Sequence, residues 1–343
     1  MKRSFLLRLL LAALCALSPF TLARAQTGAA TTSDEEFRVF NSEGKPSSME
    51  EIVGAMGGAD AVLVGEAHDD AVGHRVEAEL LRLAYARYVA TVEARHAPRS
   101  VALSLEMFER DAQTVLDEYL AGLISERHFL LSSRPWRNYE TDYRPLVEFA
   151  RAHKLPVIAA NAPARYVSRV AQNGPASLDA LSKEAKAWLP PLPVAPASRD
   201  YAAKFTRFMS GGDTASPAPA GQQSSQQQPS RQTQAQQQQA QQSSAHASAF
   251  LLDAQNLRDA SMGDALAEHL RRNSGALVLH FNGRFHSEGR LGVAEHLLRL
   301  RPKARLLVVT IFPSTAFPDF EASGARGLGD FVILTNPARA RTR

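Results

Sequence analysis

The sequence predicts an α/β fold: a mostly parallel central sheet flanked by helices, with a smaller helical lobe. Short runs rich in Val, Ile and Leu alternate along the chain with longer amphipathic stretches. The short runs are apolar almost throughout, as are strands buried on both faces of a parallel sheet. Strand and helix in alternation indicate a sheet covered by helices on both sides. Residues 107–210 contain long helical patterns and a single strand, which indicates the smaller lobe.

Six apolar runs are the predicted strands, and six amphipathic stretches between or beside them are predicted helices. The strands are Ala61–Val64, Val101–Leu105, Pro156–Ala160, Ala276–Phe281, Arg305–Ile311 and Phe331–Leu334. The helices are Val72–Val89, Ala112–Ala121, Tyr143–His153, Arg165–Ala171, Asp253–Arg272 and Leu291–Leu300. We find no internal repeat in the sequence.

The first 25 residues have the three parts of a secretory signal peptide. They begin with a basic segment, continue in an apolar run over residues 4–22, and end in the A-x-A site Ala23-Arg24-Ala25. The apolar run is too short for a comfortable transmembrane span, and no other stretch of the chain is long and apolar enough. We therefore expect cleavage between Ala25 and Gln26, a periplasmic or secreted protein, and no transmembrane segment.

The only cysteine of the sequence, Cys15, lies inside this predicted signal peptide. A lipoprotein site requires a small residue directly before the cysteine, and Leu14 stands there, so we expect no lipid anchor. The mature chain then has no thiol, which excludes disulfides, zinc–thiolate sites and a cysteine nucleophile. Any bound metal must be held by His, Glu, Asp or Tyr.

The basic balance of the chain belongs to the signal peptide. The whole sequence has 39 Lys and Arg residues against 35 Asp and Glu residues. Four of the bases and none of the acids fall within residues 1–25, so the remaining chain has 35 of each. An electrically balanced chain offers no whole-protein case for nucleic-acid binding.

Composition divides the mature chain into three kinds of segment. Residues 26–35 are small and polar and are expected to form a disordered leader. Residues 210–249 are dominated by Gln, Ser, Ala, Pro and Gly, and such a segment cannot bury enough apolar area to offset its ordering entropy. We expect a disordered insertion between two helices, with a functional flap as the alternative. Residues 36–209 and 250–337 then form the α/β domain, with the helical lobe within 107–209.

Four predicted strands end in polar or ionisable residues. The first runs into Gly65-Glu66-Ala67-His68, the second into Glu106, the third into Asn161, and the fourth into Asn282-Gly283-Arg284-Phe285-His286. In open α/β sheets, ligands bind at the carboxyl edge of the strands. The sequence therefore predicts a functional site at this edge.

Two chemistries suit the His and Glu residues at this edge. Glu66, His68, Glu106 and His286 are candidate catalytic residues, since a Glu can activate water while a His protonates a leaving group. His68, Glu106 and His286 are candidate ligands of zinc or another divalent metal. His68 and His286 each occupy the fourth place of a Gly-x-x-His pattern at a strand end, which makes the pair more specific than either alone.

Several nearby residues also have purely structural interpretations. Asn161 is a possible cap of the next helix, and Glu106 a possible partner of Arg284. His280 lies within a strand and suits a core histidine, whereas His74 can face inward or face solvent. The aromatic residues of Trp136–Leu146 suit core packing beside a domain junction.

Six segments of the chain resemble a known family. They are Val64–Asp69, Leu105–Phe108, Trp136–Leu146, Asn161–Pro163, Gln255–Met262 and Asn282–His286, in order over about residues 60–312. Together they resemble the ChaN-like haem-binding uptake family of the Tiki superfamily. The resemblance implies an exported bacterial protein linked to haem or iron uptake. It also implies a homodimer that holds a pair of stacked haems through tyrosine ligands.

Haem is the cofactor that this resemblance implies. Tyr201 is the first candidate iron ligand and Tyr166 the second, because a tyrosinate can bind ferric haem. Arg284 is the candidate cofactor-binding cation, since a guanidinium pairs with a carboxylate such as a propionate. No Cys-x-x-Cys-His motif occurs, so covalent haem attachment is excluded.

The wider superfamily implies an alternative function, because it includes Tiki-type metalloproteases and erythromycin-esterase-like hydrolases. By that resemblance His68, Glu106 and His286 would be the metal or catalytic set, with Glu66 beside them. A hydrolase, metal-dependent or metal-free, is therefore the second hypothesis, and a non-catalytic scaffold is the third. The segment before Phe250 carries Met and His in relatives, but here it is Gln-rich and holds only His246.

Overall fold

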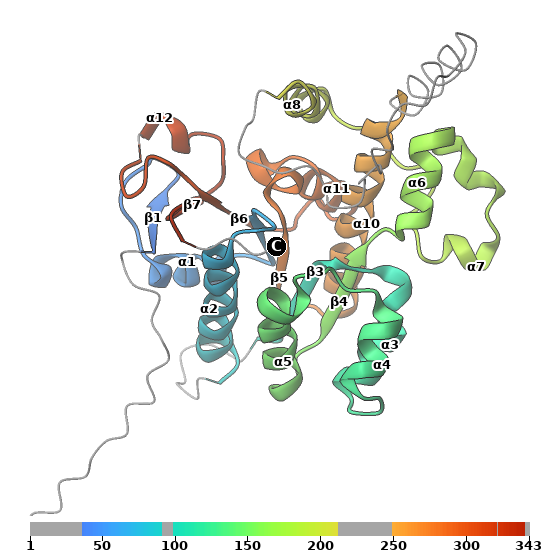
Figure 1. Cartoon of the computed structure of the whole chain (residues 1–343), viewed down its shortest axis with the longest axis horizontal. Helices are drawn as coiled ribbons and strands as arrows, with labels where there is room; N and C mark the ends of the chain where they lie inside the picture. Colours follow the sequence, from blue (N-terminus) through green and yellow to red (C-terminus); the bar gives the residue numbers. More distant parts are fainter. Residues whose placement is uncertain (1–35, 91–98, 212–248, 321, 340–343) are drawn as a thin grey trace, which may run out of the picture. The chain divides into compact units, whose positions relative to one another are not determined.

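The computed structural model describes residues 36–90, 99–211, 249–320 and 322–339 of the chain (Figure 1). The predicted signal peptide (1–25) and leader (26–35) lie outside the described residues. Nearly all of the predicted insertion (210–249) lies outside them as well.

Seven strands form a single sheet in the order β1-β7-β6-β2-β5-β3-β4. Every neighbouring pair is parallel except β1 and β7, which are antiparallel. The strands are β1 (Phe37–Asn41), β2 (Ala61–Glu66), β3 (Val101–Glu109), β4 (Val157–Asn161), β5 (Leu277–Gly283), β6 (Leu306–Pro313) and β7 (Phe331–Thr335). The predicted α/β class and all six predicted strands are confirmed. The sequence analysis missed the edge strand β1, which is short and mixes polar with apolar residues.

The predicted helices are all present, and several further short helices join them. The helices are α1 (Met49–Ala55), α2 (Ala71–Tyr88), α3 (Gln113–Leu120), α4 (Glu126–Ser133), α5 (Arg144–Ala152), α6 (Ala164–Asn173), α7 (Lys183–Lys186), α8 (Arg199–Met209), α10 (Leu251–Arg272), α11 (Val293–Leu300) and α12 (Ala322–Ala325). A π-helical turn, Tyr139–Tyr143, precedes α5. Predicted helix 143–153 therefore begins one residue later than expected.

Two helical layers cover the sheet, one on each face. In Figure 1 the blue α2 lies beside the green α5, and the orange α10 lies beside α11. Val62 and Val64 of β2 belong to the core cluster that includes residues of α1, α2 and α5. Ala61 and Leu63 belong to the cluster formed with α10 and α11. Successive strand residues point to opposite faces, so the position of a residue in its strand decides which layer it meets.

The helices between β3 and α10 bring a third apolar cluster, which packs α6 and the segment after it against α10. Its members are Ala162, Tyr166, Val167, Val170, Leu178, Leu189, Ala254 and Leu257. The predicted division into a main domain and a helical lobe stays a prediction. In the part of the chain that the structure describes, no helix has both the length and the apolar character needed to cross a membrane.

Candidate functional site

Buried polar side chains gather at the carboxyl ends of β2, β5 and β3, which are neighbours in the sheet. They form two groups, one toward each helical layer. The α2-side cluster consists of Glu66, His68, His74, Glu77, Asp142 and Tyr143. The α10-side cluster consists of Glu106, Tyr201, Gln255, Asp259 and His286.

Strand periodicity explains why the two strand-end glutamates enter different clusters. Glu66 follows Val62 and Val64 at even spacing and so points toward the layer of α2 and α5. Glu106 follows Ala102 at even spacing, and Ala102 belongs to the core cluster of α10 and α11. The register of β3 against β4 also shifts between Leu105 and Glu109, and such an irregularity re-aims side chains near a site.

In the α2-side cluster, Glu66 orients His68. Oε1 of Glu66 lies 2.6 Å from Nδ1 of His68 and accepts a hydrogen bond of 3.0 Å from the Tyr143 hydroxyl. The His68 ring contacts the edge of Trp136 at a centroid distance of 4.6 Å. The His68 side chain is 31% exposed and the Glu66 side chain 2%. His68 is therefore the imidazole that meets solvent.

His74 faces inward, which decides between its two sequence interpretations. Its Nδ1 lies 3.2 Å from Oε2 of Glu77, and its Nε2 lies 3.2 Å from the carbonyl oxygen of His68 and 3.4 Å from Oδ2 of Asp142. Burial by itself disfavours the imidazolium. The hydrogen bond to Glu77 and the charges of Glu66, Glu77 and Asp142 outweigh burial and raise the pKa of His74 to about 10. His74 is thus a buried cation among carboxylates.

Helix α2 places these groups because its first turn is fixed. Asp70 is the N-cap, and its Oδ1 accepts a 3.1 Å hydrogen bond from the Val72 amide. His74 and Glu77 are three residues apart and share the face of the helix turned to the sheet. Burial raises the pKa of Glu77 to about 7, against the opposing effect of His74.

The α10-side cluster begins with Glu106, whose carboxylate is fully paired. Its Oε2 accepts a 2.7 Å hydrogen bond from the Gly283 amide, and its Oε1 lies 3.3 Å from Nε2 of His286. Burial by itself would raise the pKa of Glu106. The charges of His286 and His68 and the Gly283 amide reverse this effect and hold the pKa well below its usual range. Glu106 is therefore ionised across the physiological pH range.

Asp259 holds His286 from its other side. Oδ1 of Asp259 lies 2.7 Å from Nδ1 of His286, and Oδ2 accepts a short hydrogen bond from the Tyr201 hydroxyl. Gln255 brings its Nε2 to 3.1 Å from Nε2 of His286. Although burial opposes the charged form, Glu106 and Asp259 raise the pKa of His286 to about 10. Tyr201, Asp259, His286 and Glu106 thus form one continuous chain of polar contacts.

The two clusters meet at Gly283. In the sheet Gly283 pairs with Glu66 of β2, while its amide bonds to Glu106 of β3. A Cβ atom on Gly283 would lie 2.8 Å from Nε2 of His68 and 3.6 Å from Oε2 of Glu106. Its φ of −57° is open to any residue, so glycine is needed here for space alone. The structure therefore brings His68, Glu106 and His286 together around one glycine.

Gly65 has the same steric role one strand away. A Cβ atom there would lie 2.7 Å from Cα of Arg284 and 2.8 Å from Oγ of Ser287. The end of β2 thus packs directly against the backbone that carries His286. Glycine at this position lets the two Gly-x-x-His segments come together.

The candidate haem-binding residues lie in three different surroundings. Tyr201 is 1% exposed and its hydroxyl is bonded to Asp259. Burial and the Asp259 charge raise its pKa well above the usual value. Tyr166 is 8% exposed, and the Arg165 guanidinium lies 4.4 Å from its ring centre, with Nη2 donating to the hydroxyl at 3.4 Å. Arg284 pairs with Glu288 at 3.0 Å.

Three sequence alternatives are decided by these contacts. Glu106 pairs with His286, and the proposed pairing with Arg284 is wrong because that guanidinium bonds to Glu288. Asn161 does not cap α6, whose N-cap is Pro163. His280 is the expected core histidine: it is fully buried and 2.9 Å from the Ser104 hydroxyl, and burial lowers its pKa to about 4.

Sequence reasoning missed Gln255, Asp259, Glu77 and Asp142 as members of the site. The sequence did contain a pattern that could have identified Gln255 and Asp259, which both lie on α10. Gln255 and Asp259 are four residues apart, and Asp259 lies on the buried stripe of α10 with Met262 and Leu266. A fully buried acid on an apolar helix stripe is a polar group that needs a partner.

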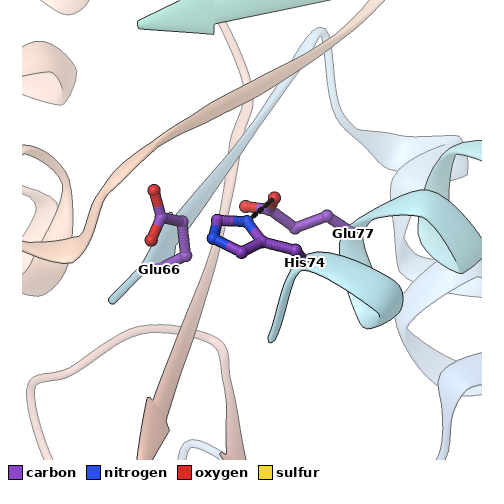
Figure 2. Close-up of side chains that lie close together, drawn as sticks. All are labelled: Glu66, His74 and Glu77. Atoms are coloured by element: carbon purple, nitrogen blue, oxygen red, sulfur yellow. Dashed lines mark hydrogen bonds and ion pairs between the residues drawn. The ribbon is translucent and has the colours of Figure 1, made fainter. Parts of the chain in front are cut away.

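The residues whose geometry suits a metal ion are not the ones predicted as metal ligands. Within the described ranges, Glu66, His74 and Glu77 each offer a ligand atom such that all three atoms lie within 4.8 Å of one another (Figure 2). His68, Glu106 and His286 are neighbours around Gly283, and their role as metal ligands stays a prediction. The same holds for the catalytic roles of Glu66, His68, Glu106 and His286.

Fold and site together define an α/β protein with a mostly parallel sheet and a buried cluster of histidines and carboxylates at its carboxyl edge. The family model described as "Haem-binding uptake, Tiki superfamily, ChaN" matches residues 52–297, a range that contains every member of both clusters. The chain therefore belongs to this haem-binding uptake family, as the sequence motifs indicated.

Solved structures are similar to this chain at low sequence identity. ChaN of Campylobacter jejuni, described with cofacial haem binding, is 14% identical, with a TM-score of 0.55 over 88% of this chain and 98% of that chain. An erythromycin esterase variant in its open conformation is 12% identical, with a TM-score of 0.41 over 88% of this chain and 83% of the other. The type III effector HopBA1 is 9% identical, with a TM-score of 0.41 over 89% and 99%. No curated protein matches the chain.

Proposed function

We propose that this protein binds haem after export and takes part in haem or iron uptake, in the periplasm or outside the cell. The observation that carries the proposal is the family match over residues 52–297. The signal peptide predicted over residues 1–25 supports export. The chain beyond that signal has no cysteine, so tyrosine, histidine and methionine are its available haem iron ligands.

Tyr166 is the better candidate iron ligand on structural grounds. A ligating phenolate must lose its proton, whereas the Tyr201 hydroxyl keeps its proton and donates a fully buried hydrogen bond to Asp259. The Tyr166 hydroxyl instead accepts a 3.4 Å hydrogen bond from Arg165, so iron binding there breaks no bond to a buried carboxylate. The hydroxyl of Tyr166 therefore suits iron ligation without dismantling the α10-side cluster. We therefore place Tyr166 ahead of Tyr201, the opposite of the order that the sequence suggested.

Propionate binding has two candidate cations. Arg165 is beside Tyr166 and its side chain is 48% exposed, although it also pairs with Asp111. Arg284 is 12% exposed and would have to leave Glu288. Arg165 is therefore the cation that is open to a ligand at the surface, and Arg284 stays a sequence-based candidate.

Hemin titration of the purified mature protein tests this function. A saturable shift of the Soret band is expected, and Tyr166→Phe should weaken hemin affinity at least about tenfold, equivalent to about 1.4 kcal/mol. Tyr201→Phe is the matched control, because it removes a hydroxyl that is bonded to Asp259. A shift lost only in Tyr201→Phe would assign the ligand to Tyr201. An unchanged spectrum at stoichiometric protein contradicts haem binding.

The same titration addresses the homodimer that the family resemblance implies. Sedimentation of the protein with and without hemin should show a dimer when haem is bound. A monomer at saturating hemin contradicts a stacked-haem arrangement and leaves the binding of a single haem.

A hydrolase is the second candidate, favoured by the polar chain around His286. Glu66 orients the solvent-facing His68, as a carboxylate orients a general base, and Asp259 holds His286 as a charged proton donor. Glu106 lies between the two imidazoles and pairs directly with His286, which keeps His286 charged as the proton donor. These are the parts of a general acid–base pair at one edge of the sheet.

A screen of ester and peptide substrates tests the hydrolase. His68→Ala and His286→Ala should each reduce turnover at least about a hundredfold, the typical contribution of a positioned acid or base. His128→Ala, an exposed histidine on α4, is the control and should leave turnover unchanged. Turnover that survives both site variants rules out this mechanism.

A further inference from the structure

We infer that Glu66, His74 and Glu77 form a divalent-metal site that is separate from the residues proposed for haem and from the α10-side cluster. All three side chains are buried, with exposures of 2%, 2% and 0%. Figure 2 shows the imidazole of His74 lying between the two carboxylates, one from the end of β2 and one from α2. The inference does not depend on haem binding.

Two carboxylate oxygens in this group lack a partner. Oε2 of Glu66 and Oε1 of Glu77 are buried and accept no hydrogen bond from any described residue. A buried carboxylate oxygen without a hydrogen-bond donor or cation destabilises the fold, because it has lost its hydrogen bonds to water and no protein group replaces them. Such orphaned atoms in native structures call for an explanation, and a bound ion is one.

The charge of the cluster also favours a cation. Three buried carboxylates, those of Glu66, Glu77 and Asp142, lie around His74, and the imidazole of His68 pairs with Glu66. A divalent ion would place two positive charges at the carboxylate oxygens that now lack partners.

The donor set fits a first-row divalent metal. Two carboxylate oxygens and one imidazole nitrogen are ligands of zinc, manganese and ferrous iron, and three protein ligands leave a further position open. The three ligand atoms lie within 4.8 Å of one another. Metal bonds of about 2.0–2.2 Å in a tetrahedral site place ligand atoms roughly 3.4 Å apart. Binding is therefore expected to draw the three side chains together and to replace the hydrogen bond between His74 and Glu77.

A Zn²⁺ titration of haem-free, chelator-treated mature protein tests the site. One equivalent of Zn²⁺ should bind. Glu77→Gln keeps the side-chain shape and should weaken Zn²⁺ affinity at least about a hundredfold, because loss of a residue that only supports a metal ligand already costs up to about a hundredfold. Glu79→Gln is the control, because this residue pairs with Arg82 on the outer face of the same helix. No stoichiometric binding to the wild type overturns the inference.

A second arm separates this site from the predicted His68, Glu106 and His286 set. Zn²⁺ binding should survive His286→Ala; loss of binding there, with retention in Glu77→Gln, overturns the inference. Pulsed EPR of the wild-type protein with one equivalent of Cu²⁺ gives the same answer even if Glu77→Gln does not fold. One coordinated imidazole supports the site at His74, whereas two coordinated imidazoles contradict it.

Discussion

Replacing Asp259 by alanine is expected to lower the free energy of unfolding by about 3–5 kcal/mol, the cost of breaking a buried ion pair from one side. The Asp259 carboxylate is fully buried and bonds to both His286 and Tyr201. Its removal leaves the His286 cation with Glu106 as its remaining buried counter-ion. The tyrosine hydroxyl also loses its acceptor. Urea unfolding at neutral pH, followed by circular dichroism, measures the loss.

Asp117→Ala provides the comparison for Asp259→Ala. Asp117 is exposed on α3 and accepts a hydrogen bond from Gln113 one turn earlier. A surface change of this kind is expected to stay within about 0.5 kcal/mol of the wild type. If both variants lose the same small amount of stability, the polar chain around His286 does not stabilise the fold as a linked unit.

Stability is expected to fall as the pH rises from about 6.5 to about 10, the interval between the ordinary pKa of histidine and that of His286 in the folded protein. A pKa raised by folding means that the folded state binds the proton more tightly than the unfolded state. The contribution of His286 is therefore complete below the unfolded pKa and is lost as the pH rises through the folded pKa. Each unit of difference corresponds to about 1.4 kcal/mol at most.

His286→Gln should make this alkaline decline shallower, and His74, whose pKa is also raised to about 10, should account for part of what remains. Urea unfolding of both proteins across the interval, with a chelator present to exclude metal effects, measures the difference in slope. His128→Gln replaces an exposed histidine on α4 and should keep the wild-type dependence. A decline of equal slope in the wild type and His286→Gln means that the charge of His286 does not contribute.

On the acid side, Glu106 acts in the opposite sense. Its pKa is lower in the folded protein than in the unfolded chain, so its contribution is present above the ordinary carboxyl pKa and is lost as the pH falls. Glu106 and His286 therefore set opposite limits on the pH range in which their shared ion pair stabilises the fold.

Much of the fold was predictable because its signals are local. Buried parallel strands are short and apolar, and helices repeat their apolar residues at a different period, so six strands and six helices could be assigned from the sequence. Edge strand β1 was missed, because Phe37–Asn41 has neither a continuous apolar run nor a neighbouring helix pattern. The positions of Glu66 and Glu106 at strand ends were also predictable, because each residue follows an apolar run.

The order of amino acids was enough to predict that polar residues follow four strands at one edge of the sheet, and that the motifs resemble a haem-binding uptake family. Which of these residues meet depends on the three-dimensional packing of the chain. Strand order β2-β5-β3 places Gly283 between Glu66 and Glu106, and the rotation of α10 brings Asp259 to His286. Strand order and helix rotation are set by packing between segments far apart in the chain, and no local pattern in the sequence encodes them.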